Sequence, residues 1–145
     1  MADWWQWSPK KEEEALTFAV VGVGRFGTAV CRELINNGVE VLAADSSEKA
    51  IDDLRQLEPS IEARVIDCTD EESMKESGIL EMNTVVVGIS EPIEASITTT
   101  LIAKDSEGTK VKRVIARATS DLHEKMLKRV GLIRLFSLLE CKVKD

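Results

Sequence analysis

The stretch Thr17–Gly27, with the sequence TFAVVGVGRFG, decides how the rest of the chain folds. Five residues rich in β-branched and apolar side chains lead directly into Gly22, Gly24 and Gly27, which have the G-x-G-x-x-G spacing of a nucleotide-binding strand-to-helix turn. The first glycine permits the tight turn, the second lets the backbone approach a pyrophosphate, and the third lets the next helix pack close to the strand. The alternative is an ordinary αβ turn that holds no ligand.

The segment after the glycines predicts a helix and then a second strand that ends at a carboxylate. Phe26, Val30 and Leu34 recur at every fourth residue, which is the pattern of an amphipathic helix. The run 39–44 predicts the second strand, and Asp45 ends it about 20 residues after the glycine turn. A carboxylate there accepts hydrogen bonds from ribose hydroxyls and repels a 2′-phosphate, which favours NAD or an adenine nucleotide over NADP.

The same carboxylate has a simpler interpretation. Asp45 precedes a predicted helix, so its side chain could cap that helix without touching any ligand. Ser46 or Ser47 could fill the capping role equally well, which would leave Asp45 available for a ribose.

Strands and helices alternate along the rest of the chain. The run 84–89, with three consecutive valines, is continuously apolar and is expected to be a central strand buried on both faces. Right-handed crossovers between parallel strands then predict an α/β fold, a doubly wound, Rossmann-like parallel sheet with strand order 3-2-1-4-5-6. The further expected helices are 48–57, 70–77, 92–105 and 121–130, and the further expected strands are 63–66, 111–118 and 132–135.

Net charge, hydropathy and cysteine spacing exclude several classes of protein. A net charge of −7 argues against nucleic acid as a partner, because a phosphate backbone demands a basic face. No apolar run approaches the roughly 20 residues of a membrane-spanning helix. The three cysteines, Cys31, Cys68 and Cys141, share no metal-ligand spacing and no signal peptide precedes them, so we expect free thiols in a reducing cytoplasm.

Three segments differ in composition. We expect residues 1–15 to form an N-terminal arm, residues 16–138 a single nucleotide-binding domain, and residues 139–145 a C-terminal tail without a second domain. All three tryptophans of the chain lie in the arm, where they could anchor to a partner or a membrane interface. Loosely held chain ends are common, so the alternative is that residues 1–15 are simply a mobile chain end.

Few residues outside the glycine turn are candidates for chemistry. Asp67 and Cys68 follow the third expected strand at the edge where ligands bind, although Thr69 could simply cap the next helix there. Arg25 lies inside the glycine turn and could pair with phosphate oxygens or be solvated. The single histidine, His123, has no candidate nucleophile or metal partner, so we expect a surface or capping residue. We predict neither catalytic residues nor a metal site.

Taken together, these motifs resemble a known family. VVGVGRFG at 20–27, the strand-end Asp45, DCTD at 67–70, EAS at 94–96 ahead of Lys104, and ARA at 116–118 followed by LKRVG at 127–131 are similar to the KTN (RCK N-terminal, TrkA-N) domain of Trk/Ktr-type potassium-uptake regulatory subunits. The resemblance covers residues 17–135. Those relatives continue beyond the point that corresponds to Asp145, so this chain is either a short natural form or part of a longer protein.

The resemblance implies a function and a set of site residues. Domains of this family bind NAD(H) or ATP/ADP, assemble as dimers and rings, and gate a membrane potassium channel or transporter from the cytoplasm. It places Arg25 near the phosphates, Asp45 on the ribose, Asp67 and Cys68 near the adenine, and Lys104 and Arg117 at the phosphates or the neighbouring subunit. The full set of expected cofactor-binding residues is Gly22, Val23, Gly24, Arg25, Phe26, Gly27, Asp45, Ser46, Asp67, Cys68, Lys104 and Arg117.

Two further expectations concern function and assembly. We expect a non-catalytic, nucleotide-sensing regulator that is peripheral to the inner membrane through a potassium-translocating subunit; the alternative is a small NAD-dependent oxidoreductase or a fragment of one. We also expect at least a homodimer, because an apolar patch near the chain end should find a partner. That patch comprises the last helix with Leu132, Ile133, Leu135, Phe136, Leu138 and Leu139.

Overall fold

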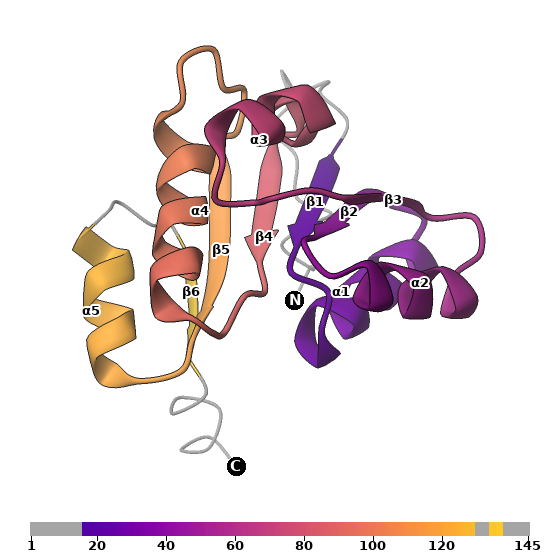
Figure 1. Cartoon of the computed structure of the whole chain (residues 1–145), viewed down its shortest axis with the longest axis horizontal. Coiled ribbons are helices and arrows are strands. Elements are labelled where there is room, and N and C mark those ends of the chain that lie inside the picture. The colour runs from indigo at the N-terminus through magenta and orange to yellow at the C-terminus, as the bar shows by residue number, and fades with distance from the viewer. Residues whose placement is uncertain (1–15, 130–133, 138–145) are drawn as a thin grey trace, which may run out of the picture.

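The computed structural model describes residues 16–129 and 134–137 of the chain (Figure 1). They form a parallel six-stranded sheet with the order β3-β2-β1-β4-β5-β6, which confirms the predicted fold class and strand order. The strands are β1 (Thr17–Val21), β2 (Glu40–Asp45), β3 (Glu62–Val65), β4 (Thr84–Val87), β5 (Arg113–Ala118) and β6 (Arg134–Ser137). The helices are α1 (Arg25–Asn36), α2 (Glu48–Leu57), α3 (Glu71–Ser77), α4 (Ile93–Asp105) and α5 (Asp121–Arg129), with a 3₁₀ turn η1 (Ile79–Glu81).

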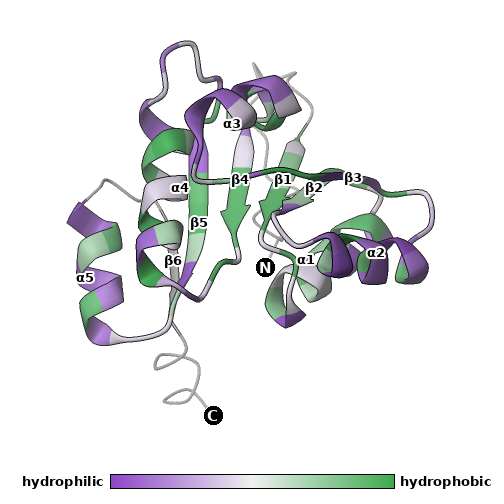
Figure 2. Cartoon of the chain, viewed as in Figure 1, coloured by the Kyte–Doolittle hydropathy of each residue, from purple (hydrophilic) through white to green (hydrophobic). Residues whose placement is uncertain are grey.

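Helices cover both faces of the sheet. One apolar cluster joins β1, β2 and β4 to α1 and α2 through side chains that include Cys31, Ile51 and Leu54. A second cluster lies on the other face, where α3, η1, α4 and α5 contribute residues that include Met74 and Leu127. Colouring by hydropathy shows the apolar strands between the mixed surfaces of these helices (Figure 2). The two layers are those of a doubly wound sheet.

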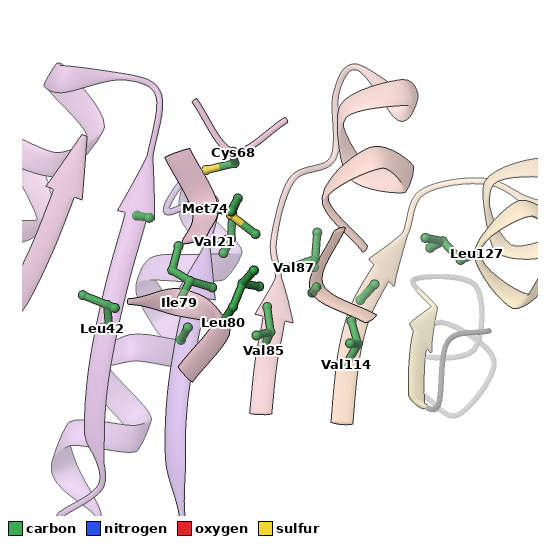
Figure 3. Close-up of a cluster of buried hydrophobic side chains, with 14 of the residues drawn as sticks. Val21, Leu42, Cys68, Met74, Ile79, Leu80, Val85, Val87, Val114 and Leu127 are labelled. Carbon is green, nitrogen blue, oxygen red and sulfur yellow. The ribbon is translucent and has the colours of Figure 1, made fainter. Parts of the chain in front are cut away.

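The central strand β4 explains why its sequence is continuously apolar. Val85 and Val87 point into the cluster with α3, η1 and α4, whereas Val86 packs on the side of α1 and α2. All three are less than 5% exposed, since a strand with helices on both faces has no solvated side. Figure 3 shows Val85 and Val87 beside Leu80 and Val114 in the first of these clusters.

Several boundaries differ from the predicted ones. The fourth strand ends at Val87, and not at residue 89, because Gly88 leaves the strand to pack against the glycine turn. The sixth strand is Arg134–Ser137, two residues later than predicted. Asp70, and not Thr69, caps α3, since its carboxylate accepts the N–H of Ser73 at 2.9 Å.

Some expectations fall on residues that lie outside the described part of the chain. These are the tryptophan arm 1–15, Cys141 in the tail 139–145, and the apolar residues 132, 133, 138 and 139. Within residues 16–129 and 134–137, no helix is both long and apolar enough to cross a lipid bilayer.

Candidate functional site

The glycine turn has the geometry that its spacing predicts. Gly22 adopts a φ of +94°, which only glycine enters without strain, and its carbonyl oxygen turns toward the start of α1. A Cβ on Gly27 would overlap that carbonyl oxygen, and a Cβ on Gly88 would lie 2.6 Å from it. A Cβ on Gly24 would meet no atom within 4 Å, so this glycine faces open space. The backbone is therefore tightly packed at Gly22 and Gly27, whereas at Gly24 there is space for a ligand to approach it.

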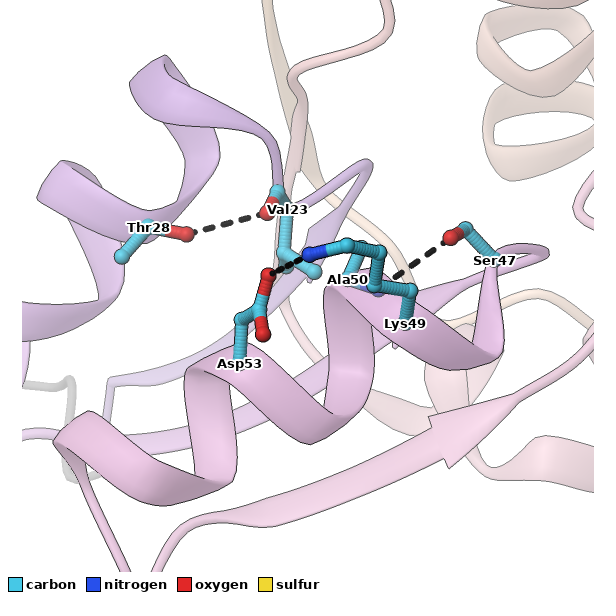
Figure 4. A network of polar contacts seen from close by, with 6 residues as sticks. All are labelled: Val23, Thr28, Ser47, Lys49, Ala50 and Asp53. Atoms are coloured by element: carbon cyan, nitrogen blue, oxygen red, sulfur yellow. Dashed lines mark hydrogen bonds and ion pairs between the residues drawn. The ribbon is translucent and has the colours of Figure 1, made fainter.

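Asp45 fastens this turn to the end of β2. Its Oδ2 accepts the backbone N–H of Val23 at 2.8 Å, and its Oδ1 accepts the N–H of Ser47 at 2.8 Å. Ser47 is the residue that caps α2, because its hydroxyl oxygen accepts the N–H of Ala50 at 3.1 Å (Figure 4). The capping role foreseen as an alternative for Asp45 thus belongs to Ser47. Thr28 braces the turn from the other side by donating to the carbonyl of Val23 at 2.9 Å.

A cavity of about 250 Å³ opens beside the turn, at the carboxyl edge of the sheet. Six residues expected to bind a cofactor line it, and they come from three separate parts of the sequence: Gly22, Gly24, Asp45, Ser46, Asp67 and Cys68. The cavity lies where β1 and β4 are neighbours while their connections run to opposite sides, which is where ligands bind in sheets of this kind. The first turn of α1 adjoins it and has no side-chain cap.

Half of the residues that line the cavity were not predicted from the sequence. Thr69 and the segment Gly88–Pro92, together with Ala95 of α4, complete the lining. Their position could have been inferred from the strand order, because Gly88–Pro92 follows the central strand and must emerge at the carboxyl edge next to the glycine turn.

The remaining expected residues lie outside the cavity. Val23 is buried in the core, and Arg25 is exposed at the start of α1. Phe26 is half-buried, and the guanidinium carbon of Arg117 lies 5.2 Å from the centroid of its ring. The Nε of Arg117 is buried without a hydrogen-bond partner among the described residues. Lys104 lies in the last turn of α4, whereas the cavity is at the first turn.

The polar lining of the cavity is acidic and its thiol is inert. Hydrogen bonds from the hydroxyl and the N–H of Thr69 lower the pKa of the Asp67 carboxyl, which is therefore ionised at neutral pH. Burial, reinforced by the charges of Asp45 and Asp67, raises the pKa of the Cys68 thiol to about 12. A thiol in this state is a poor nucleophile at neutral pH. Cys31 and Cys68 are both free, as predicted.

His123 is not at the surface as expected, although its ring accepts a backbone N–H just before α5, as a capping residue would. Its side chain is fully buried, with Nδ1 3.1 Å from the backbone N of Thr119 and Nε2 2.9 Å from the hydroxyl oxygen of Ser96. Because the N–H of Thr119 must donate, Nδ1 is the acceptor and Nε2 carries the proton. The reason is the orientation of α5, which turns His123 and Leu127 inward and leaves Leu122 and Met126 exposed. Among the described residues no group of three or more potential ligands is arranged to hold a metal.

The burial of His123 predicts how stability depends on pH. Desolvation lowers the pKa of this imidazole in the folded protein, whereas an unfolded chain has the ordinary value of about 6.5. Its contribution is therefore complete above about pH 6.5 and is lost as the pH falls through the folded-state pKa, because the unfolded chain binds the proton first. Urea unfolding at several pH values from about 7.5 to 5 should show the free energy of unfolding decreasing in the wild type and decreasing less in His123→Gln. Equal slopes would contradict a neutral, buried imidazole.

The sequence is similar to that of known potassium uptake proteins. The family model of the TrkA-N domain matches residues 18–138. Ktr system potassium uptake protein C of Bacillus subtilis (strain 168) is 40% identical over 114 residues, which cover 79% of this chain and 49% of that protein. Ktr system potassium uptake protein A of Vibrio alginolyticus is 37% identical over 114 residues, or 79% of this chain and 50% of that protein. The chain therefore spans about half of the length of these relatives.

Solved structures share the fold at low sequence identity. The TrkA-N domain of the inner membrane protein ybaL from Escherichia coli superposes with a TM-score of 0.76 at 18% identity, covering 92% of this chain and 95% of that one. The GsuK channel bound to NAD superposes with a TM-score of 0.71 at 11% identity, covering 86% of this chain and 22% of that one. These likenesses extend the agreement in fold beyond the sequence relatives. From the match over 18–138 and the identity to Ktr proteins, we conclude that the chain belongs to the TrkA-N domain family.

Proposed function

We propose that this chain is a nucleotide-sensing regulatory domain of a potassium transport system. The observation that carries the proposal is the cavity, in which a glycine turn, the strand-end carboxylate of Asp45 and the ionised Asp67 meet at one edge of the sheet. The Ktr relatives are potassium uptake proteins by name, and the GsuK channel has been seen with NAD and with ADP. These relatives support potassium as the transported ion and an adenine nucleotide as the ligand.

Within this proposal, the cavity takes the adenosine part of NAD(H) or of ATP/ADP. Its volume of about 250 Å³ is just below the range of about 300–1,000 Å³ for ligand pockets, so a whole dinucleotide would extend outside it. The phosphates would lie at Gly24, Arg25 and the first turn of α1. Arg117 would meet the phosphates or a neighbouring subunit, since its buried Nε needs an acceptor. Lys104, at the far end of α4, fits the neighbouring subunit.

The cavity favours sensing over catalysis. A catalytic site needs a group that can donate, accept or attack at neutral pH. The Cys68 thiol has a raised pKa, and the only histidine is held by Ser96 and Thr119 away from the cavity. Of the carboxylates in the cavity, Asp45 accepts two backbone N–H groups and Asp67 accepts two hydrogen bonds from Thr69, so both are already engaged. We infer a non-catalytic domain that works in the cytoplasm and binds a membrane potassium-translocating subunit, with the nucleotide shifting the balance between two arrangements of paired subunits.

Ligand choice tests the site directly. The carboxylate of Asp45 would repel a 2′-phosphate, so NADPH should bind at least about tenfold more weakly than NADH, which corresponds to roughly 1.4 kcal/mol. Titration calorimetry of the full chain with both cofactors measures the difference. Equal affinities would mean that Asp45 does not face the ribose, and absence of heat with NADH, ADP and ATP would remove the proposed function.

Assembly gives a second test. Leu122 and Met126 are spaced one turn apart on α5 and are 63% and 39% exposed, so they form one apolar stripe. We expect the full chain to scatter light as at least twice its mass of 16.1 kDa, and Leu122→Lys to lower that mass toward one chain. Leu57→Lys is the matched control, because Leu57 is 50% exposed on α2, on the other face of the sheet. A monomeric wild type would contradict the dimer.

A further inference from the structure

Helix α4 buries hydroxyl groups where an apolar residue would pack more simply. Ser96, Thr99 and Thr100 are all fully buried, and a buried hydroxyl destabilises the fold unless it is hydrogen-bonded. The hydroxyl of Thr100 stays within the helix and donates to the carbonyl of Ser96 at 2.9 Å. Those of Ser96 and Thr99 contact two different partners outside the helix, so they link α4 to other parts of the fold.

One of these links ends at the cavity. The hydroxyl of Thr99 donates to the carbonyl oxygen of Cys68 at 3.0 Å, and Cys68 lines the cavity. Pro92 and Ala95, one turn before Ser96 and Thr99, line the same cavity. The first half of α4 therefore forms one wall of the cavity and is bonded to a second wall.

The other link ends in α5. Ser96 contacts Nε2 of His123 at 2.9 Å, and Nδ1 of the same ring accepts the N–H of Thr119 at 3.1 Å. The backbone N–H of His123 also donates to the hydroxyl of Ser120 at 3.1 Å. The ring is thus held at both nitrogens, and a rotation of α5 would break these contacts together. Figure 1 shows α5 on the outer side of α4, away from α1 and α2.

We propose that the Thr99–Cys68 and Ser96–His123 hydrogen bonds couple occupancy of the cavity to the order of α5. A ligand that holds Cys68 and Ala95 in place reduces the local opening of α4, and the buried imidazole passes that restraint to α5 and its exposed Leu122 stripe. Coupling of this kind is reciprocal, so a partner bound at α5 raises the affinity of the cavity for its ligand by the same factor. The inference rests on the proposed nucleotide site and adds the route by which the site acts.

Hydrogen exchange of the full chain, with and without saturating NADH, tests this route. In the wild type, NADH should slow exchange of the α5 amides by about fivefold, at the lower end of coupling between sites. Ser96→Ala should keep the slowing at the glycine turn, residues 22–27, and lose most of it at α5. Thr100→Val is the matched control, because it removes an equally buried hydroxyl on the same helix whose bond does not leave α4. It should respond to NADH as the wild type does.

A second variant tests the same link if Ser96→Ala does not fold. His123→Asn keeps an acceptor for the N–H of Thr119 but is too short to reach Ser96, so it should also separate the two responses. Calorimetry on the same samples shows whether NADH binds, which separates a failure of the coupling from a failure of the nucleotide site. If NADH binds the wild type without slowing exchange at α5, the coupling is wrong and the nucleotide site stands. The same conclusion follows if NADH slows α5 exchange equally in Ser96→Ala and Thr100→Val. If the wild type binds no NADH, the proposed function and the coupling both fall.

Discussion

Gly27→Ala should destabilise the protein by about 3 kcal/mol, at the upper end of the usual cost of forcing extra volume into a packed region. The added Cβ would overlap the carbonyl oxygen of Gly22, and this neighbour is backbone, which cannot rotate away as a side chain can. Moving Gly22 would disturb Gly88 as well, since the same oxygen faces both glycines. Urea unfolding of both proteins measures the loss.

Gly24→Ala is the matched control for that experiment. Its added Cβ would meet no atom within 4 Å, so Gly24→Ala should lose much less stability than Gly27→Ala. The same variant should bind NADH more weakly, because the methyl group occupies the space that the phosphates approach. If both variants lose equal stability, the close contact between Gly27 and Gly22 does not organise the turn.

Asp45→Ala should weaken NADH binding by about a hundredfold, since two hydrogen bonds from ribose hydroxyls to a charged group contribute roughly 3 kcal/mol together. The structure adds a cost in stability of about 1–2 kcal/mol, because the N–H groups of Val23 and Ser47 both lose their acceptor. Asp45→Asn keeps one acceptor oxygen, so it should retain more of the stability than of the affinity.

Calorimetry and urea unfolding of the three proteins separate these effects. If Asp45→Ala binds NADH as the wild type does, Asp45 only fastens the turn. If it unfolds before it can be titrated, Asp45→Asn still reports the loss of affinity.

The fold was predictable because local and long-range signals agree. Three glycines at fixed spacing define the first turn, and the alternation of apolar runs with amphipathic segments leaves a parallel sheet as the simplest arrangement. The valine run of β4 identified the central strand, since only a strand covered on both faces has no polar positions. Strand ends were less certain because tertiary contacts, such as Gly88 against Gly22, decide where pairing stops.

The inward face of α5 was not predictable in the same way. Leu122 and Met126 are spaced four residues apart, and so are His123 and Leu127, so two stripes compete for the core. Hydropathy favours burying the leucine and methionine, but the structure buries His123 because Ser96 and Thr119 satisfy both ring nitrogens. Those partners come from a different helix and from the loop before α5, and no local pattern shows that they meet.

The candidate site was predictable to the extent that it depends on strand ends. Asp45 ends β2 and Asp67 follows β3, so their meeting at the carboxyl edge followed from the strand order. The hydrogen bond from the Val23 N–H to Asp45 could not be predicted in this way, because it depends on the path of the glycine turn. The contact of Arg117 with Phe26 was not predictable either, because it joins the end of β5 to the start of α1.

Native mass spectrometry of the full chain, sprayed with NADH, ADP or ATP in turn, tests nucleotide sensing by this domain, because it reports bound nucleotide and subunit number together. We expect a dimer that retains one nucleotide per chain for at least one of these ligands, and loss of that added mass in Asp45→Ala and Gly24→Ala. A chain that retains none of the three, or that retains them equally after both substitutions, would contradict a nucleotide-sensing domain built on this cavity.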